Sequence, residues 1–340
     1  MRRRWFIPVL VGASLLVGST AALAGDPVAG AGSTFAQKMI VQWANDLAPK
    51  GVQVTYTGSG SGDGRAKLIA GEVDFAGSDG AAKPEEEEKL DAKYGGLVHI
   101  PVTSGGIAVV YNVAEFPDLK LTGPTLAKIF SGTITNWKDP AIAADNGGPG
   151  PDLPIKVFVR ADKSGSSGVF SGYLDAAGEG NWKGKTTEQF PPPANGEGKD
   201  GSDALAQAII DTKGGVGYVD HGKAASKQLD EVRVKNAAGN VRGPELSAVR
   251  AAIDEAKIND DGTLTVTYTP SSPDAYPIST VTYVISKAKV PQKKQETLAA
   301  FLTYALSQPG QDKAPGNGYA PLSEKMQKHG LAQVDKIRPT

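Results

Sequence analysis

The amino-acid sequence predicts a protein of the α/β class, in which strands alternate with helices. Apolar, β-branched runs occupy residues 52–56, 155–159 and 280–286, and each is followed by a stretch with the apolar spacing of a helix. Clusters of glycine and serine join the first two runs to their helices. This alternation is typical of parallel or mixed sheets covered by helices. A length of 340 residues, of which 40% are hydrophobic, is sufficient for two domains.

The N-terminus has the pattern of a secretory signal peptide over residues 1–24. Arginines fill positions 2–4, a mainly apolar run covers 5–19, and Ala-Leu-Ala at 22–24 provides a cleavage site. We therefore expect a mature chain that begins at Gly25 and is exported. A retained transmembrane anchor is the alternative, but the apolar run is shorter than the roughly 20 residues that a span requires.

Composition excludes several classes of protein. The net charge is −1 and becomes more negative once the arginine-rich segment is removed, so binding of nucleic acid through bulk positive charge is not expected. The absence of cysteine excludes disulfides, thiolate metal sites and a cysteine nucleophile. His99, His221 and His329 are far apart in the sequence and form no metal-binding motif. We expect neither a metal nor a cofactor.

Glycine- and serine-rich turns follow the strands in the first third of the chain. Residues 30–35 read GAGSTF and precede a helical stripe, with Ser33 as the expected N-cap. Residues 57–64 follow the strand at 52–56 and precede a second helix. A third strand ends in the polar turn Ser78-Asp79.

The middle of the chain is expected to begin with a pair of strands. Residues 97–102 and 107–112 are apolar, and the intervening 103–106, which read TSGG, predict a turn. Residues 178–202 are rich in Gly, Pro, Lys and Glu and predict an irregular excursion. A helix and a strand are expected after it, at 203–210 and 214–220.

The stretch from Ile155 to Gly168 carries the strongest indication of function. Arg160 ends a predicted strand, and Ser164, Gly165 and Ser166 occupy the first turn of the following helix. Amides in a first helical turn lack intrahelical partners, and a guanidinium offers parallel donors to a tetrahedral anion. These groups together predict a site for a small oxyanion. The alternative is an ordinary strand-to-helix turn with a surface arginine.

Enzyme motifs occur only in incomplete form. Residues 196–201 match G-x-G-x-x-G but follow no apolar strand, and Gly-Lys-Thr at 184–186 lacks the first glycine of a P-loop. There is no G-x-S-x-G sequence. No nucleophile with an accompanying base is therefore identified, and we do not expect an enzyme.

Four of these motifs, taken together, resemble the phosphate-binding proteins of bacterial ABC transporters. They are residues 30–35, 58–64, 78–79 and 160–166, and similarity extends to 126–142 and 318–322, hence over nearly the whole mature chain. The resemblance implies an α/β, two-lobed periplasmic-binding-protein fold of type II, with a mixed sheet flanked by helices in each lobe. It also implies two hinge crossings, near Tyr111 and Pro277. Lobe I would comprise residues 25–111 plus 277–340, and lobe II residues 112–276.

The resemblance also implies a set of ligand contacts. Asp79 would accept a hydrogen bond from the proton of monohydrogen phosphate and reject sulfate, which has no such proton. A carboxylate that caps a helix is the alternative for Asp79, and Asp162 is expected to brace Arg160 from behind. The implied phosphate contacts are Thr34, Phe35 (through its amide), Ser61, Asp79, Arg160, Ser164, Gly165 and Ser166.

The function implied is binding of inorganic phosphate and its delivery to the membrane permease of an ABC transporter. The protein would be a monomer in the periplasm. A secreted phosphatase-like enzyme on the same fold, or a binding protein for sulfate or molybdate, are the alternatives. Two departures from the family pattern stand out: Ser166 replaces a threonine, and Asp63 is an extra acid that could pair with Arg160, pair with another residue, or face solvent.

Overall fold

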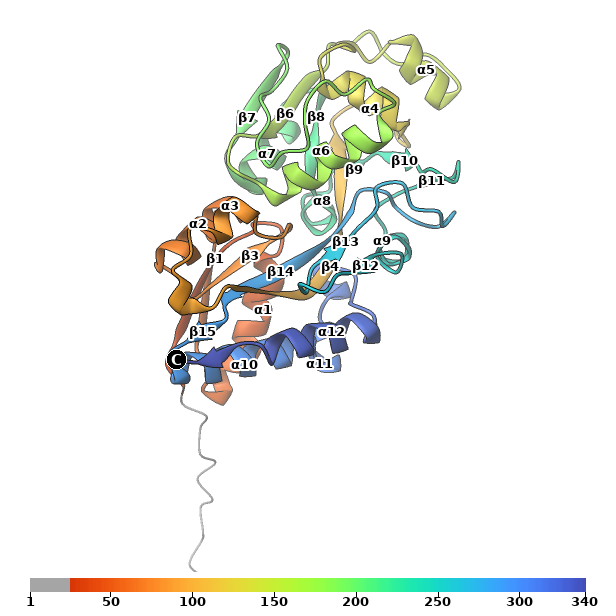
Figure 1. Cartoon of the computed structure of the whole chain (residues 1–340). Coiled ribbons are helices and arrows are strands. Elements are labelled where there is room, and N and C mark those ends of the chain that lie inside the picture. The colour runs from red at the N-terminus through yellow and green to blue at the C-terminus, as the bar shows by residue number, and fades with distance from the viewer. Residues whose placement is uncertain (1–24) are drawn as a thin grey trace, which may run out of the picture.

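The structure is a computed structural model that describes residues 25–340. The expected signal peptide, residues 1–24, lies outside the described residues. Strands and helices alternate along most of the chain, so the predicted α/β class is confirmed. Figure 1 shows two groups of elements, one above the other, with β4 (Leu97–Tyr111) and β14 (Ser279–Lys287) at the level where they meet.

One large mixed sheet runs through both groups. Its strand order is β2-β1-β3-β14-β4-β8-β6-β7, with β9 paired to β4. The strands next to β14 on both sides are antiparallel to it, while β1 is parallel to both β2 and β3, and β6 is parallel to both β7 and β8. The remaining strands of this sheet are β1 (Val28–Gly32), β2 (Val54–Gly58), β3 (Phe75–Ser78), β6 (Lys156–Arg160), β7 (Gly196–Lys199), β8 (Gly215–Asp220) and β9 (Asp230–Glu231).

Helices cover the sheet, and short strands pair at its margins. The helices are α1 (Gln37–Leu47), α2 (Ser61–Ala70), α3 (Pro84–Glu87), α4 (Gly123–Phe130), α5 (Pro140–Asn146), α6 (Gly165–Ala177), α7 (Gly201–Ile210), α8 (His221–Lys227), α9 (Leu246–Ile253), α10 (Gln292–Leu306), α11 (Gln308–Gln311) and α12 (Glu324–Val334), with 3-10 turns at Ala48–Lys50, Ala92–Tyr94 and Pro315–Asn317. The short strands are β5 (Lys120–Leu121), β10 (Arg233–Lys235), β11 (Val241–Arg242), β12 (Lys257–Ile258), β13 (Leu264–Thr265), β15 (Lys289–Val290) and β16 (Arg338–Pro339).

The turn predicted at residues 103–106 is wrong, because β4 is one continuous strand of 15 residues. Its two glycines provide close packing instead of a turn. A Cβ on Gly105 would lie 2.6 Å from the ring of Phe35, and one on Gly106 would lie 3.0 Å from the side chain of Val249. Residues up to Gly106 pair with β14, and residues from Ile107 onward pair with β8. The strand therefore changes partner in its middle.

Two other sequence expectations need correction. The helix after the first glycine-rich turn begins at Gln37, and Ser33 caps only the preceding turn, where its Oγ accepts a hydrogen bond from the amide of Ala36 at 3.1 Å. The excursion at 178–202 is not wholly irregular, because it contains β7, which pairs with β6. That strand is rich in Gly, Glu and Lys, so no apolar pattern reveals it.

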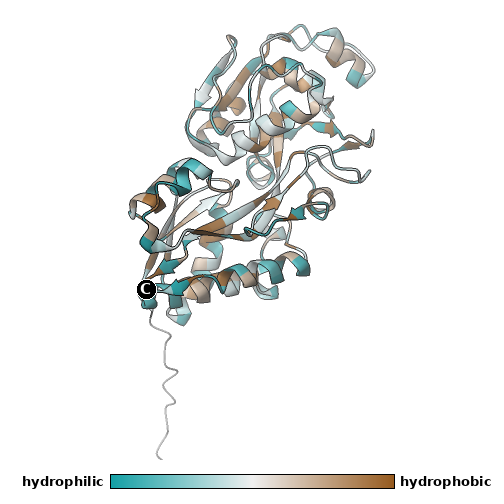
Figure 2. Ribbon diagram, in the orientation of Figure 1, coloured by the Kyte–Doolittle hydropathy of each residue, from teal (hydrophilic) through white to brown (hydrophobic). Residues whose placement is uncertain are grey.

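The hydrophobic core lies between the sheet and its helices. The apolar stripe of α1 is buried as its spacing predicts, with Met39, Ile40 and Trp43 fully covered. Figure 2 shows hydrophobic residues along the central strands and a mixture of hydrophobic and hydrophilic residues along α10 and α12. Within residues 25–340, no helix combines the length and the apolar character that crossing a membrane requires.

Candidate oxyanion-binding site

The four turns singled out in the sequence come together where the two groups of elements meet. Three of them follow strands: β1 leads into the turn before α1, β2 into α2, and β3 into Asp79. Because β1, β2 and β3 are parallel, their carboxyl ends lie at one edge of the sheet. The fourth turn, between β6 and α6, packs against this edge. The amide of Gly62 donates to the carbonyl of Lys163 at 3.2 Å.

Arg160 lies in the middle of the assembled turns. It is 2% exposed, and its Nη1 donates to Thr34 Oγ1 at 3.2 Å and to Ser202 Oγ at 3.1 Å. On its other side, Nε donates to Asp162 Oδ1 at 2.6 Å, and Nη2 pairs with Oδ2. Two parallel bonds fix the plane of the guanidinium. Burial alone would raise the pKa of Asp162, but the hydrogen bonds and charge of Arg160 hold it below the usual value.

The first turn of α6 faces the edge of the sheet. Ser164 is the N-cap residue, and its Oγ accepts a hydrogen bond from the amide of Ser167 at 3.4 Å. Position 165 has to be glycine for the two sides to approach this closely. A Cβ there would lie 2.5 Å from Ser61 Oγ and 2.7 Å from the Cβ of Asp79. The N-terminal amides of this 13-residue helix and the positive end of its dipole thus point into the site.

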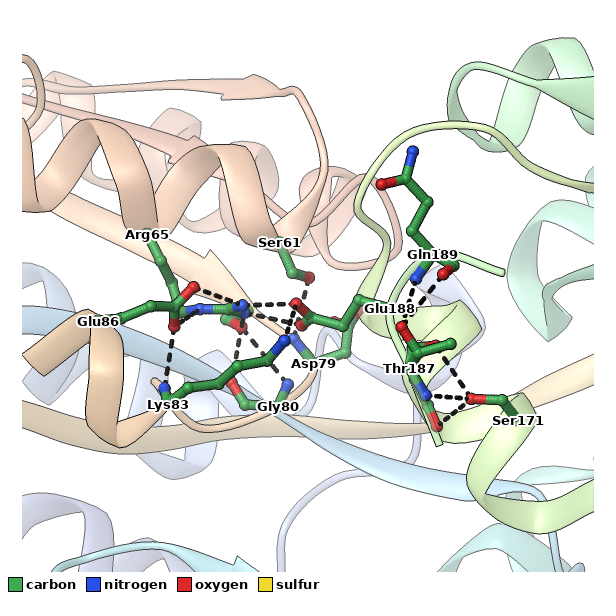
Figure 3. A network of polar contacts seen from close by, with 12 residues as sticks. Ser61, Arg65, Asp79, Gly80, Lys83, Glu86, Ser171, Thr187, Glu188 and Gln189 are labelled. Carbon is green, nitrogen blue, oxygen red and sulfur yellow. Dashed lines mark hydrogen bonds and ion pairs between the residues drawn. The ribbon is translucent and has the colours of Figure 1, made fainter. Parts of the chain in front are cut away.

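Asp79 is a buried carboxylate within a cluster of hydroxyl groups. Its Oδ1 accepts hydrogen bonds from Ser33 Oγ at 2.7 Å and from Thr282 Oγ1 at 2.8 Å. Its amide donates to Ser61 Oγ at 3.3 Å. Burial raises the pKa of Asp79, while the two hydroxyls and the charge of Arg160 act in the opposite direction. Figure 3 shows Ser61 directly beside Asp79.

Phe35 and Ser166 complete the predicted set. The ring of Phe35 is buried and meets Tyr319 edge-on, with ring centroids 5.5 Å apart, and the Tyr319 hydroxyl donates to the Phe35 carbonyl. Within residues 25–340, no hydrogen bond is found from the amide of Phe35, so this amide can serve a ligand. Ser166 is 3% exposed on α6. All eight predicted contact residues therefore lie on the turns that meet here, and their contact with phosphate remains a prediction.

Sequence reasoning missed three hydroxyl residues of this cluster. The sequence assigns Ser33 only a capping role, and Thr282 lies in the middle of β14. Ser202 is the last residue of the tract 178–202, which the sequence predicts to be irregular. Ser202 could have been found, because Gly201-Ser202 precedes a helical pattern as Gly165-Ser166 does.

The extra acid of the second turn lies outside the cluster. Asp63 pairs with Lys67 one turn along α2, at 2.7 Å, and its side chain is 43% exposed. It makes no ion pair with Arg160, whose carboxylate partner is Asp162. Of the three possibilities left open by the sequence, the structure shows pairing with another residue.

A second arginine joins the two sides of the site (Figure 3). Arg65 on α2 is fully buried, and its five N–H groups reach Ser78, Glu86 and Glu188. Glu86 lies in α3, on the same side as Arg65, whereas Glu188 comes from the excursion after α6. Burial would lower the pKa of Arg65, but the hydrogen bonds that it donates to both glutamates, together with their negative charge, raise it.

The chemistry of the site suits an anion. It offers buried hydroxyls, a helix N-terminus and an immobilised guanidinium. Asp79 Oδ2, for which no donor is found within residues 25–340, could accept a hydrogen bond from a ligand. Within the described part of the chain, no group of His, Cys, Asp and Glu is arranged to hold a metal ion.

Comparison with known proteins shows the family to which the chain belongs. The model of the PBP superfamily domain matches residues 17–309, so the chain is a member of that superfamily. Phosphate-binding protein PstS 3 of Mycobacterium leprae is 33% identical over 308 residues, which cover 86% of this chain and 82% of the relative. Phosphate-binding protein PstS of Xylella fastidiosa is 31% identical over 88% of this chain and 83% of its own. The chain belongs to the PstS family of phosphate-binding proteins.

Solved structures confirm the two-lobed periplasmic-binding-protein fold. The high-affinity periplasmic phosphate-binding protein PfluDING, bound with phosphate at pH 8.5, has a TM-score of 0.75 at 22% identity, covering 90% of this chain and 93% of its own. A putative phosphate ABC transporter substrate-binding protein with bound phosphate from Clostridium perfringens has a TM-score of 0.63 at 20% identity, covering 88% and 100%.

Proposed function

We propose that this protein binds inorganic phosphate between its two groups of elements and delivers it to the permease of an ABC transporter. The observation that carries the proposal is the convergence of Arg160, the first turn of α6 and the turn after β1 on one buried point. Fixed N–H and O–H donors there can replace the hydration shell of an anion without a metal counter-ion. The names of the PstS relatives support the same ligand.

The eight predicted residues are proposed as the phosphate contacts. Arg160 would provide charged donors, and Phe35 and Gly165 would provide amides. Hydroxyl groups would come from Thr34, Ser61, Ser164 and Ser166. Asp79 would accept the hydrogen bond from the proton of monohydrogen phosphate. Sulfate has only acceptor oxygens, so Asp79 would face it acceptor to acceptor and reject it. Molybdate is expected to be rejected for the same reason.

Two lobes would close over the ligand by a hinge motion. We propose lobe I as residues 25–111 plus 277–340 and lobe II as 112–276, with crossings in β4 and before β14. The change of pairing partner between Gly106 and Ile107 is where we expect β4 to bend. Contacts that the ligand makes to both lobes would bias the hinge toward the closed state.

We further propose that the protein acts as an exported, periplasmic monomer and as a binding protein without catalytic activity. The relatives bear names that describe binding, and the site presents no activated nucleophile. A phosphatase-like enzyme is the competing function. Release of phosphate from an ester by the purified protein would support that alternative.

The decisive experiment is replacement of Arg160 by alanine. Arg160→Ala should lower phosphate affinity at least about 100-fold, because it removes a buried charged donor group, and circular dichroism should show a retained fold. Arg250→Ala is the matched control, since Arg250 is 53% exposed on α9, far along the chain from the four turns. Titration calorimetry with phosphate compares the three proteins. Near-normal binding by Arg160→Ala would refute the site.

A further inference from the structure

Two hydroxyl groups from distant parts of the chain meet at one oxygen of Asp79. Ser33 follows β1, and Thr282 lies in the middle of β14. Their Oγ atoms are 2.7 Å and 2.8 Å from Asp79 Oδ1, and both side chains are buried. A carboxylate oxygen accepts about two hydrogen bonds, so these donors saturate Oδ1.

The other oxygen of Asp79 has a different environment. Within residues 25–340, no donor is found for Oδ2. A Cβ on Gly165 would lie 2.9 Å from Oδ2, which places this oxygen against the first turn of α6. The carboxylate therefore has one oxygen occupied by the protein and one turned toward the proposed phosphate position.

We propose that Ser33 and Thr282 set the choice between oxyanions by holding Asp79 ionised, with Oδ2 as its single free acceptor. The inference rests on the proposed phosphate function and assigns a selectivity role within it. Ser33 and Thr282 are positioning residues, because they act on the ligand through Asp79.

The physical reason is the balance between the two protonation states of Asp79. A hydrogen bond donated to a carboxylate favours its ionised form, whereas burial favours the neutral form. Ionised Asp79 accepts the proton of phosphate and repels sulfate. Neutral Asp79 would carry its proton on Oδ2, because Oδ1 is saturated, and would then donate to sulfate. Loss of a hydroxyl should therefore admit sulfate at a higher pH.

Other ionisable groups near Asp79 are common to the wild type and the variants. The charge of Arg160 favours ionised Asp79 and that of Glu188 opposes it. Asp220, Tyr56 and Tyr319 also interact electrostatically with Asp79. Within residues 25–340, none of these groups hydrogen-bonds to Ser33 Oγ or Thr282 Oγ1, and Tyr56 donates to the backbone carbonyl of Ser33, which the variants keep. Replacement of either hydroxyl therefore leaves these groups in place.

The test compares Thr282→Val with Thr280→Val. Valine has nearly the shape of threonine, and Thr280 donates to the backbone carbonyl of Asp79 at 3.1 Å instead of to its carboxylate. Ser33→Ala removes the second donor. Thr282→Ser and Ser33→Thr change each side chain but keep its hydroxyl group. Phosphate and sulfate affinities are measured by calorimetry from about pH 5 to 8.5, the range in which ligand and carboxylate protonation are linked. Thermal unfolding shows whether each variant is folded.

Thr282→Val and Ser33→Ala should each lower the phosphate-to-sulfate affinity ratio about tenfold and move the onset of sulfate binding up by about one pH unit. The two variants that keep a hydroxyl, and Thr280→Val, should have the wild-type affinity ratio and the wild-type pH dependence of sulfate binding. If Thr282→Val is folded and shows the same ratio and pH profile as Thr280→Val, the inference is overturned. If the wild-type protein binds neither anion, the proposed function fails instead.

Discussion

The ion pair between Arg65 and Glu188 leads to a prediction about closure. Glu188 accepts from Arg65 Nη1 at 2.9 Å and from Nη2 at 2.6 Å, and it comes from the opposite side of the proposed cleft. Glu86 accepts from Nε of the same arginine at 2.7 Å but belongs to the same side. Glu188→Gln should therefore destabilise the closed state relative to the open one. Glu86→Gln should instead lower the free energy of unfolding of lobe I.

The size of the effect follows from the contacts. Glutamine keeps one acceptor and replaces the other by an amide donor that faces the guanidinium. The closed state thus loses one charge-assisted hydrogen bond, which contributes about 1.5–3 kcal/mol. The Glu188 side chain is only 12% exposed, so solvent screening removes little of this energy. In the proposed open state Glu188 would be hydrated, so the substitution would cost little there. A loss of about 2 kcal/mol corresponds to phosphate binding about 30-fold weaker.

The assay pairs calorimetric titration with urea unfolding of the ligand-free protein. Glu188→Gln should bind phosphate about 30-fold more weakly and unfold at nearly the wild-type urea concentration. Glu86→Gln should bind phosphate nearly as the wild type does but unfold at lower urea. An equal loss of affinity in both variants would refute the reasoning, because it would show that the arginine acts on binding from within its own lobe.

Two further changes test the packing and the electrostatics. Gly165→Ala should lower phosphate affinity about 10- to 100-fold through overpacking against Ser61 and Asp79. Gly148→Ala, whose Cβ would meet nothing within 4 Å, should not, and equal calorimetric losses would contradict this. Burial raises the pKa of Asp220 to about 6, so folded protein holds a proton that the unfolded chain has lost, and stability falls as pH rises from about 4 to 6. The Asp220→Asn variant has no carboxyl group at this position. Its free energy of unfolding relative to wild type, measured with urea, should therefore rise by about 3 kcal/mol between about pH 4 and 7. A difference that does not change with pH would argue against the raised pKa.

The parts of the site that are local in sequence could be predicted. The residues next to Arg160 and Ser164 suffice to predict that Arg160 ends a strand and that Ser164 precedes a helix. The structure has β6 and α6 in those places. Strand and helix patterns also gave the α/β class. The family resemblance supplied the grouping of four turns, which no single turn could indicate.

Contacts between distant residues could not be predicted. Arg65 and Glu188 are 123 positions apart, and Ser33 and Thr282 meet only because β14 lies beside β3. The turn predicted at Gly105-Gly106 failed for a related reason. Those glycines allow Phe35 and Val249 to pack against β4, and a sequence pattern cannot distinguish a glycine that bends the chain from one that makes room for a neighbour.

The place of β14 in the sheet has a consequence for the order of folding. This strand, residues 279–287 of 340, lies between β3 and β4, which are consecutive strands in the sequence. A growing chain can form the parallel pairs of β1, β2 and β3 early. The backbone N–H and C=O groups of β3 and β4 that pair with β14, however, have no partner until residue 287 is available. Contacts of such long sequence separation are slow to form. We therefore expect the sheet to be completed late. The nascent chain should then remain incompletely folded, and able to pass through a narrow channel, until most of its length has been synthesised.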